Sequence, residues 1–69
     1  MGDPRLGSRL KEVRTAAGLT QAELAERIGV SRKTINTVEN GVFIPSTLLA
    51  LDLARALMTP VDTLFFLKD

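Results

Sequence analysis

Three glycines, spaced eleven and twelve residues apart, most constrain how this chain can fold. Gly18, Gly29 and Gly41 each follow a run with apolar residues at helical spacing, and glycine is the favoured residue just beyond a helix end. Two of the next segments begin with a hydroxyl residue suited to cap a helix, Thr20 and Ser31. The chain is therefore expected to form several short helices joined by tight turns.

The remaining helix start and stop signals predict five helices and no internal strand. Asp3 as N-cap and Pro4 in the first turn predict a first helix that ends at Gly18. Thr20 and Glu23 form a capping box at the start of the second helix. The later predicted elements are a third helix from Ser31 to about Asn40, a fourth over residues 47–58 between Ser46 and Pro60, a short fifth through Val61, Asp62 and Leu64, and a strand over residues 66–69. We expect one compact all-α domain over residues 1–69, in which a short C-terminal strand can lie at a dimer interface.

The composition excludes most enzyme and metal-site chemistry. A chain of 69 residues holds one domain, and this one has no cysteine and no histidine. Disulfides, thiolate and imidazole metal sites, and the common nucleophile–base pairs are therefore ruled out. We expect a binding protein rather than an enzyme, with no cofactor, metal or small-molecule ligand implied.

Neither a targeting signal nor a membrane segment is visible in the sequence. The N-terminus is polar, and no apolar run approaches the roughly 20 residues that span a bilayer. The sequence therefore predicts a soluble, cytoplasmic protein without a membrane partner.

Charge is divided unevenly along the chain. Residues 1–33 carry seven basic and four acidic side chains, whereas residues 34–69 carry two basic and four acidic ones. A basic half favours an anionic partner such as nucleic acid. An ordinary solvated surface is the alternative, because the excess of basic over acidic side chains is small.

Residues 20–40 form a candidate helix-turn-helix, two short helices joined by a turn that contains Gly29. Val30, Ile35 and Val38 are expected to hold one side of the second helix against the core. The opposite side is polar and has no carboxylate at its centre; it carries Lys33, Asn36, Thr37 and Asn40, flanked by Arg32 and Thr34. Such side chains hydrogen-bond base edges in the major groove, whereas plain helix surfaces favour Glu, Lys, Ala and Gln. A chance polar face is the alternative.

Residues 19–32, Leu-Thr-Gln-Ala-Glu-Leu-Ala-Glu-Arg-Ile-Gly-Val-Ser-Arg, resemble the helix-turn-helix of the phage repressor and Cro-like family, also called XRE. Thr34-Ile35, Glu39-Asn40-Gly41 and Pro45-Ser46 follow at the family's spacing. The resemblance extends over about residues 6–65. It implies a five-helix domain that binds double-stranded DNA at pseudo-palindromic sites and regulates transcription.

The resemblance also implies roles for individual residues. The positions from which the family contacts bases are occupied by Arg32, Lys33, Thr34, Asn36 and Thr37. The positions that contact DNA phosphates are occupied by Gln21, Ser31 and Asn40. The family's glutamine at the position of Gln21 also braces the third helix, and an ordinary surface glutamine is the alternative. Arg14 and Glu39 match a structural ion pair that ties the first helix to the end of the third. Arg32 and Lys33 can instead bind phosphate, and Ser31 and Asn40 can instead cap the helix.

The chain departs from the family pattern after Gly41. Val42 and Phe43 stand where many members carry Lys or Arg as a further phosphate contact. Each lost phosphate contact lowers the affinity for DNA and the salt dependence of that affinity, so weaker binding to the DNA backbone is expected on this side of the domain. Phe43 can pack against the domain or against a sugar.

A second departure is an apolar surplus in the last third of the chain. The predicted core is complete without it and contains Leu10, Val13, Leu24, Ile28, Val30, Ile35, Val38, Leu51, Ala54, Leu57, Val61 and Leu64. The surplus consists of Leu48, Leu49, Leu53, Met58, Phe65, Phe66 and Leu67. Exposed apolar patches mark interfaces, so we expect a two-fold symmetric homodimer with a dimerisation segment at about residues 61–69, through Leu48, Phe65, Phe66 and Leu67. The alternative is that these apolar residues belong to a larger core within one chain.

Three functions remain open from the sequence. The leading hypothesis is a sequence-specific regulator, in the first place a repressor, that binds a pseudo-palindromic operator as a homodimer through residues 32–40. The second is an antitoxin or restriction-control autorepressor whose apolar surface holds a partner protein. The third is a protein-interaction module that has kept the fold and lost DNA binding.

Overall fold

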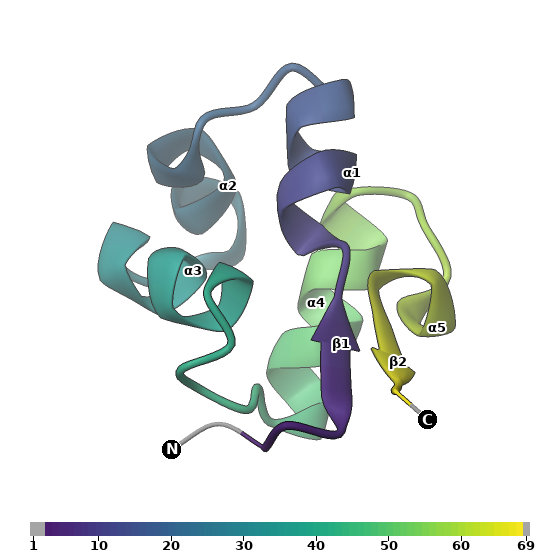
Figure 1. Ribbon diagram of the computed structural model, residues 1–69. Helices are drawn as coiled ribbons and strands as arrows, with labels where there is room; N and C mark the ends of the chain where they lie inside the picture. The colour runs from purple at the N-terminus through teal and green to yellow at the C-terminus, as the bar shows by residue number, and fades with distance from the viewer. Residues whose placement is uncertain (1–2, 69) are drawn as a thin grey trace.

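Five helices and one two-stranded sheet make up the computed structural model, which describes residues 3–68 (Figure 1). The elements in chain order are β1 (Leu6–Ser8), α1 (Leu10–Ala16), α2 (Gln21–Ile28), α3 (Arg32–Glu39), α4 (Thr47–Ala56), α5 (Val61–Leu64) and β2 (Phe65–Leu67). The predicted five-helix domain is confirmed. Within residues 3–68, none of the helices is long and apolar enough to cross a membrane.

The predicted N-caps of α2, α3 and α4 are present. The Thr20 hydroxyl accepts a hydrogen bond from the Glu23 amide at 3.0 Å, and the Glu23 carboxylate accepts one from the Thr20 amide at 2.9 Å. Ser31 and Ser46 accept in the same way from amides three residues ahead, both at 3.1 Å. Local hydrogen bonds thus fix where these helices begin.

The capping box also makes the start of α2 sensitive to acid. The hydrogen bond from the Thr20 backbone, and then that from its side chain, hold the pKa of Glu23 below its ordinary value of 4.5. A carboxyl whose pKa is lowered on folding stabilises the fold at neutral pH. That contribution is lost as the pH falls through the folded-state pKa of Glu23.

The predicted first helix from Asp3 and Pro4 is wrong at its N-terminal end. The Asp3 carboxylate accepts hydrogen bonds from the Arg5 amide at 2.9 Å and from its guanidinium at 2.8 Å, which closes a turn instead of a helix. Residues 6–8 are then extended and form β1, although no internal strand was expected. Helix α1 begins only at Leu10, whose amide donates to the Ser8 hydroxyl at 3.2 Å.

The strand β1 exists because the end of the chain returns beside it. It pairs antiparallel with β2, with Leu6 opposite Leu67 and Gly7 opposite Phe66 (Figure 1). The Phe66 ring covers the buried Gly7 and lies under the Arg9 guanidinium, 4.1 Å from its centroid. The predicted C-terminal strand is therefore confirmed, and its partner strand belongs to the same chain.

Gly7→Ala is expected to lower the free energy of unfolding by about 1–3 kcal/mol. A methyl group at this position would overlap the Phe66 ring, which must swing away from Gly7 and Arg9. Thermal unfolding followed by circular dichroism measures the change. In a Phe66→Ala background the same substitution should cost much less, because the overlapping ring is gone; an equal cost in both backgrounds would contradict the explanation.

The core lies between the helices and is nearly as predicted. Its buried members are Leu10, Leu24, Ala25, Ile35, Val38, Leu53, Ala54, Leu57 and Leu64. The half-buried residues packed against it include Val13, Ile28, Val30, Leu49, Val61 and Phe65. The core joins all five helices and holds α3 at the surface of the domain.

The predicted buried face of the fourth helix is right for Ala54 and Leu57 but wrong for Leu51 and Leu53, and the predicted length is wrong. Leu53, expected outside the core, is fully buried, whereas Leu51, expected inside, is 51% exposed. Leucine fills four of the ten positions of α4, so the apolar pattern permits more than one buried face. The helix also ends at Ala56 rather than at residue 58, because Met58 adopts a left-handed conformation with φ of 51°.

Candidate nucleic-acid interface

Helices α2 and α3 pack against each other across a tight turn (Figure 1). Gly29 takes a left-handed conformation with φ of 74°, and the Val30 amide donates to the Ala25 carbonyl at 3.0 Å. Ile35 and Val38 point into the core, so the opposite side of α3 faces outward. This arrangement is the helix-turn-helix expected from residues 20–40.

The outward side of α3 carries two cations and two amides. Arg32, Lys33, Asn36 and Asn40 are all exposed. The first three line a shallow hollow of about 230 Å³. Guanidinium, ammonium and amide groups are the donors and acceptors that pair with base edges and phosphates. The structure thus brings four of the eight predicted DNA-contacting residues together on one open surface.

Three hydroxyl groups expected to contact DNA form hydrogen bonds within the chain instead. Thr34 is half-buried, and its hydroxyl lies 3.0 Å from that of Ser31. The Thr37 hydroxyl donates to the Thr34 carbonyl at 3.0 Å. Ser31 caps α3, as described above. These hydroxyls are therefore held close to the helix.

Arg14 and Glu39 form an ion pair beneath this surface. The Arg14 Nε donates to Glu39 Oε2 at 2.6 Å and its Nη2 to Oε1 at 3.2 Å, while Nη1 donates to the Leu19 carbonyl at 2.7 Å. The side chains are 11% and 2% exposed. Hydrogen bonding to the carboxylate raises the pKa of Arg14 further. Because Glu39 is the one acidic residue of α3, the outward side is left without negative charge.

Gln21 connects the ion pair to the outward side. Its Nε2 donates to Glu39 Oε1 at 3.0 Å, and its Oε1 accepts from Asn36 Nδ2 at 3.5 Å. Asn40 Nδ2 in turn donates to Asn36 Oδ1 at 3.0 Å. We call these five side chains, from Arg14 to Asn40, the polar network. The family resemblance indicated both the Arg14–Glu39 pair and a brace from Gln21 to the third helix, and the structure identifies Glu39 and Asn36 as the residues that Gln21 contacts.

The segment after α3 adds an apolar edge to the interface. The amides of Val42 and Phe43 donate to the Thr37 carbonyl at 3.0 and 3.3 Å. The Phe43 ring, 45% exposed, borders a hollow of about 180 Å³ together with Ser31, Lys33, Thr34 and Thr37. Phe43 therefore lies beside the residues expected to contact DNA rather than inside the core.

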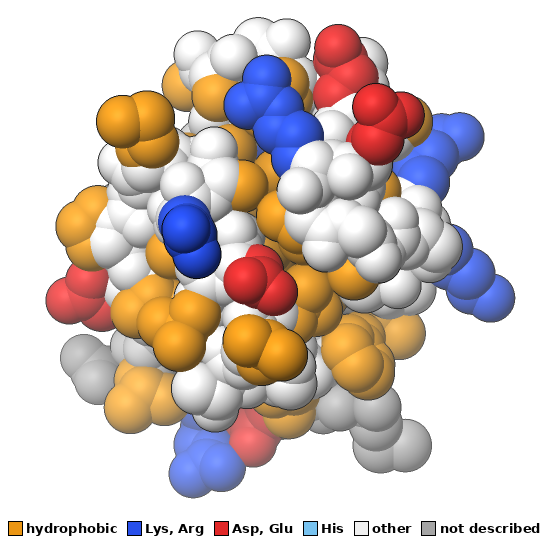
Figure 2. All heavy atoms as spheres, turned by 180° about the vertical axis from the view of Figure 1, so that it is seen from behind, with side chains coloured by type: hydrophobic (Ala, Val, Ile, Leu, Met, Phe, Trp, Pro, Cys, Tyr) orange, Lys and Arg blue, Asp and Glu red, His pale blue; other side chains and the backbone are white. Residues whose placement is uncertain are grey.

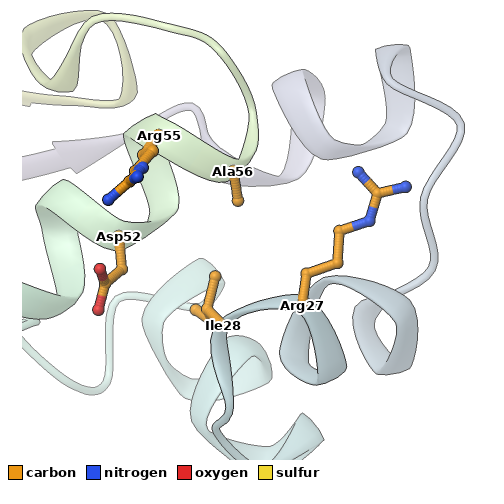
Figure 3. Close-up of a pocket in the computed structure, with 5 residues that line it drawn as sticks. All are labelled: Arg27, Ile28, Asp52, Arg55 and Ala56. Carbon is orange, nitrogen blue, oxygen red and sulfur yellow. The ribbon is translucent and has the colours of Figure 1, made fainter.

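A larger hollow of about 480 Å³ lies between α2 and α4 (Figure 3). Arg27 and Arg55 stand on opposite sides of it, with Ile28 and Ala56 between them and Asp52 turned aside. Each arginine belongs to the last turn of its helix, where a cation offsets the helix dipole. That structural role accounts for both charges, and the hollow is not part of the α3 surface.

The residues expected at a dimer interface differ in exposure. Leu48 is 70% and Leu67 is 77% exposed. Phe65 packs against the core and Phe66 covers Gly7, so both aromatic rings are half-buried within the chain. Seen from behind, hydrophobic side chains occupy much of the lower part of the surface, interrupted by few charges (Figure 2). Met58, at 93%, and Leu51 add to the exposed apolar residues.

Comparison with known proteins adds independent support for the helix-turn-helix. Residues 10–64 match the helix-turn-helix family HTH_3. The chain is 36% identical to YgzD of Bacillus subtilis, an HTH-type transcriptional regulator, over 90% of this chain and 94% of that protein. It is 35% identical to the ImmF control region 10 kDa protein of Bacillus phage phi105, over 84% of this chain and 73% of that protein.

A solved structure shows the same arrangement of helices. The restriction-modification controller protein C.AhdI from Aeromonas hydrophila superposes with a TM-score of 0.74 at 42% sequence identity. The superposition covers 77% of this chain and 80% of that chain. The likeness thus extends to most of both chains.

Proposed function

Because the chain belongs to the HTH_3 helix-turn-helix family of DNA-binding transcriptional regulators, we propose that it acts as a repressor that binds a pseudo-palindromic operator as a homodimer. The family binds DNA and catalyses no reaction. The observation that carries the proposal is the outward side of α3, where Arg32, Lys33 and Asn36 are exposed while Glu39 is turned inward and paired. A helix so equipped fits the major groove.

The residues of the interface divide into two proposed roles. We assign base contacts to Arg32, Lys33 and Asn36, supported by their exposure, with Thr34 and Thr37 offering methyl groups to thymine. Gln21, Ser31 and Asn40 lie at the ends of α2 and α3, and we assign them to phosphates.

In bacterial, archaeal and phage-infected cells such a regulator works in the cytoplasm, where the DNA is.

Asn36→Ala and Lys33→Ala are each expected to weaken operator binding by about 1–3 kcal/mol and to relax the preference at particular base pairs. The reason is that each removes a donor or acceptor that faces base edges. Sites selected from random DNA supply the operator, and gel shifts over a range of salt concentrations measure the affinities.

Lys11→Ala is the matched control, because it removes a cation from the exposed surface of α1 and should leave the base preference unchanged. Losses of equal size on every DNA sequence would show that Asn36 and Lys33 contact phosphates. Wild-type binding that ignores both salt and sequence would overturn the DNA-binding proposal.

The proposed homodimer would place two copies of α3 about 34 Å apart, one turn of DNA. The exposure of Leu48 and Leu67 supports an interface that includes α4 and the C-terminal segment. Phe65 and Phe66 would contribute the ring surface that Gly7 and the core leave uncovered.

Leu48→Glu and Leu67→Glu are expected to convert the dimer to a monomer without unfolding it, because both side chains already face outward. Sedimentation equilibrium measures the change, and Ala17→Glu, an equal charge at the exposed end of α1, should leave the dimer intact. A wild-type chain that sediments as a monomer at tens of micromolar would remove the dimer from the proposal.

A second candidate function is control of a restriction-modification system. The similarity to C.AhdI favours it over an antitoxin role. The genes that neighbour the selected operator distinguish the candidates: a restriction endonuclease gene supports the controller role, and its absence from every selected site argues against it.

A further inference from the structure

The side of α4 that faces away from the core carries leucines as well as charges. Leu48, Leu51 and Arg55 follow one another at spacings of three and four residues, which places them on one side of the helix. Both leucines are more than half exposed, and Arg55 is exposed. Asp52 lies between them and is half-buried. We call these four residues the α4 face, an exposed surface that combines apolar side chains with one charge of each sign.

The two charges of the α4 face have no ion-pair partner in the described part of the chain. Both ion pairs found within residues 3–68 are made by other residues. Asp52 and Arg55 are three residues apart and opposite in sign. A second copy of α4 that runs antiparallel to the first presents an arginine to the aspartate and an aspartate to the arginine. The α4 face is therefore complementary in charge to itself.

Met58 continues this exposed surface beyond the end of α4 and has an unfavourable backbone conformation. Its φ is 51°, whereas the other left-handed positions within residues 3–68 are held by glycines. Its side chain is almost fully exposed, so no packing within the chain compensates for the strain. Strained residues are concentrated at sites that have a function. A contact of Met58 with another molecule accounts for both observations.

We propose that the α4 face packs antiparallel against the α4 face of a second copy, with Asp52 of each chain paired with Arg55 of the partner subunit. The inference rests on the proposed homodimer and specifies the surface that closes it. A two-fold axis perpendicular to α4, passing between positions 52 and 55, makes both ion pairs at once. The same axis places Met58 near Leu48 of the partner subunit. The apolar contacts contribute affinity, and the two ion pairs fix the register.

This packing agrees with the use of two copies of α3 on DNA. In Figure 1, α3 lies to the left of α4, whereas α5 lies to its right. Rotation about an axis that points from α4 toward the side of α3 reverses the direction of α4 and keeps both copies of α3 on that side. A pseudo-palindromic site requires two recognition helices on one side of the dimer.

Charge reversal in one chain at a time tests the ion pairs. Asp52→Arg leaves only cations on the α4 face, and Arg55→Asp leaves only carboxylates, so each variant repels its own copy. Each should weaken dimerisation by about tenfold or more in sedimentation equilibrium. An equal mixture of the two variants should form a heterodimer, with a dissociation constant within about threefold of that of the wild type. Native mass spectrometry identifies this heterodimer by its mass, which lies between those of the two homodimers.

Glu12→Arg is the matched control. It makes the same charge change as Asp52→Arg on the exposed surface of α1 and should leave the dimer intact. Circular dichroism establishes that the variants fold. A mixture of Asp52→Arg and Arg55→Asp that stays monomeric would show that the two charges act within one helix, and would overturn the proposed pairing. Homodimers of both variants as tight as the wild type would overturn it as well.

Met58→Gly distinguishes a role in the interface from a role in folding. Glycine adopts the left-handed conformation without strain, so the midpoint of urea unfolding should not fall. This midpoint is measured at concentrations at which the wild type is monomeric. Dimerisation should nevertheless weaken by about threefold or more, because the contact with the partner subunit is lost. A dimer as tight as the wild type would show that Met58 lies outside the interface.

The outcomes separate this inference from the proposed function. A wild-type dimer that ignores Asp52→Arg, Arg55→Asp and Met58→Gly would overturn the α4 packing and leave the homodimer standing, closed by another surface. A wild-type chain that stays monomeric both free and on DNA would overturn the proposed homodimer itself.

Discussion

Glu39→Ala is expected to lower the free energy of unfolding by about 3–5 kcal/mol. The substitution leaves the Arg14 guanidinium, 11% exposed, without its anion in a place where water can solvate it poorly. It also removes the acceptor for Gln21 at the base of the polar network. Urea denaturation followed by circular dichroism measures the loss.

The size of this loss matters because the domain is small. At roughly 0.05–0.15 kcal/mol per residue, a chain of 69 residues has only about 3–10 kcal/mol of stability. Glu39→Ala should therefore leave a substantial unfolded population at physiological temperature. Loss of DNA binding in this variant would follow from unfolding rather than from a lost contact.

Two further variants separate the loss of the ion pair from the general effect of removing a carboxylate. Glu26→Ala removes an exposed carboxylate from α2 and should change stability little. Replacing both partners, as Arg14→Met with Glu39→Met, should restore much of the loss, because no unpaired charge is left buried. If Glu39→Ala proved no more costly than Glu26→Ala, the pair would have no structural role.

Leu53→Ala is expected to lower the free energy of unfolding by about 2–5 kcal/mol. Leu53 is fully buried in α4, and truncation leaves a cavity in the middle of the core that close packing does not refill. Urea denaturation measures the change as a lower midpoint. The slope of the unfolding free energy against urea concentration is expected to stay constant.

Leu51→Ala provides a control of the same chemistry two residues away. Leu51 is 51% exposed, so its truncation should change the stability of the monomer by no more than about 0.5 kcal/mol. Equal effects of the two substitutions would mean that α4 packs with a different face than the structure has.

The predictable parts of the fold depend on short-range interactions. The capping box of Thr20 and Glu23 and the serine caps join groups three residues apart, so a few letters of sequence are enough to identify them. The same holds for the outward side of α3, because helical geometry assigns Lys33 and Asn36 to one side as soon as Ile35 and Val38 are buried.

The parts that could not be predicted depend on partners distant in the chain. The pairing of Leu6 with Leu67 makes β1 a strand, yet residues 3–8 have a plausible helix start of their own. The leucine-rich α4 has two candidate apolar faces, and its neighbours determine that Leu53 rather than Leu51 is buried. A hydrogen bond between Gln21 and Glu39 spans eighteen residues, and only the family resemblance, not the local sequence pattern, pointed to a contact of Gln21 with the third helix.

The amino-acid sequence thus specified five helices, the caps of α2, α3 and α4, and the residues on the outward side of α3, because these depend on neighbours within one or two helical turns. Packing of distant segments specified the sheet, the buried face of α4 and the orientation of the amides in the polar network. Those features arise when side chains such as Phe66 over Gly7, or Gln21 beside Glu39, meet across the folded domain. Contacts of that kind depend on the relative placement of whole elements, which no local pattern contains.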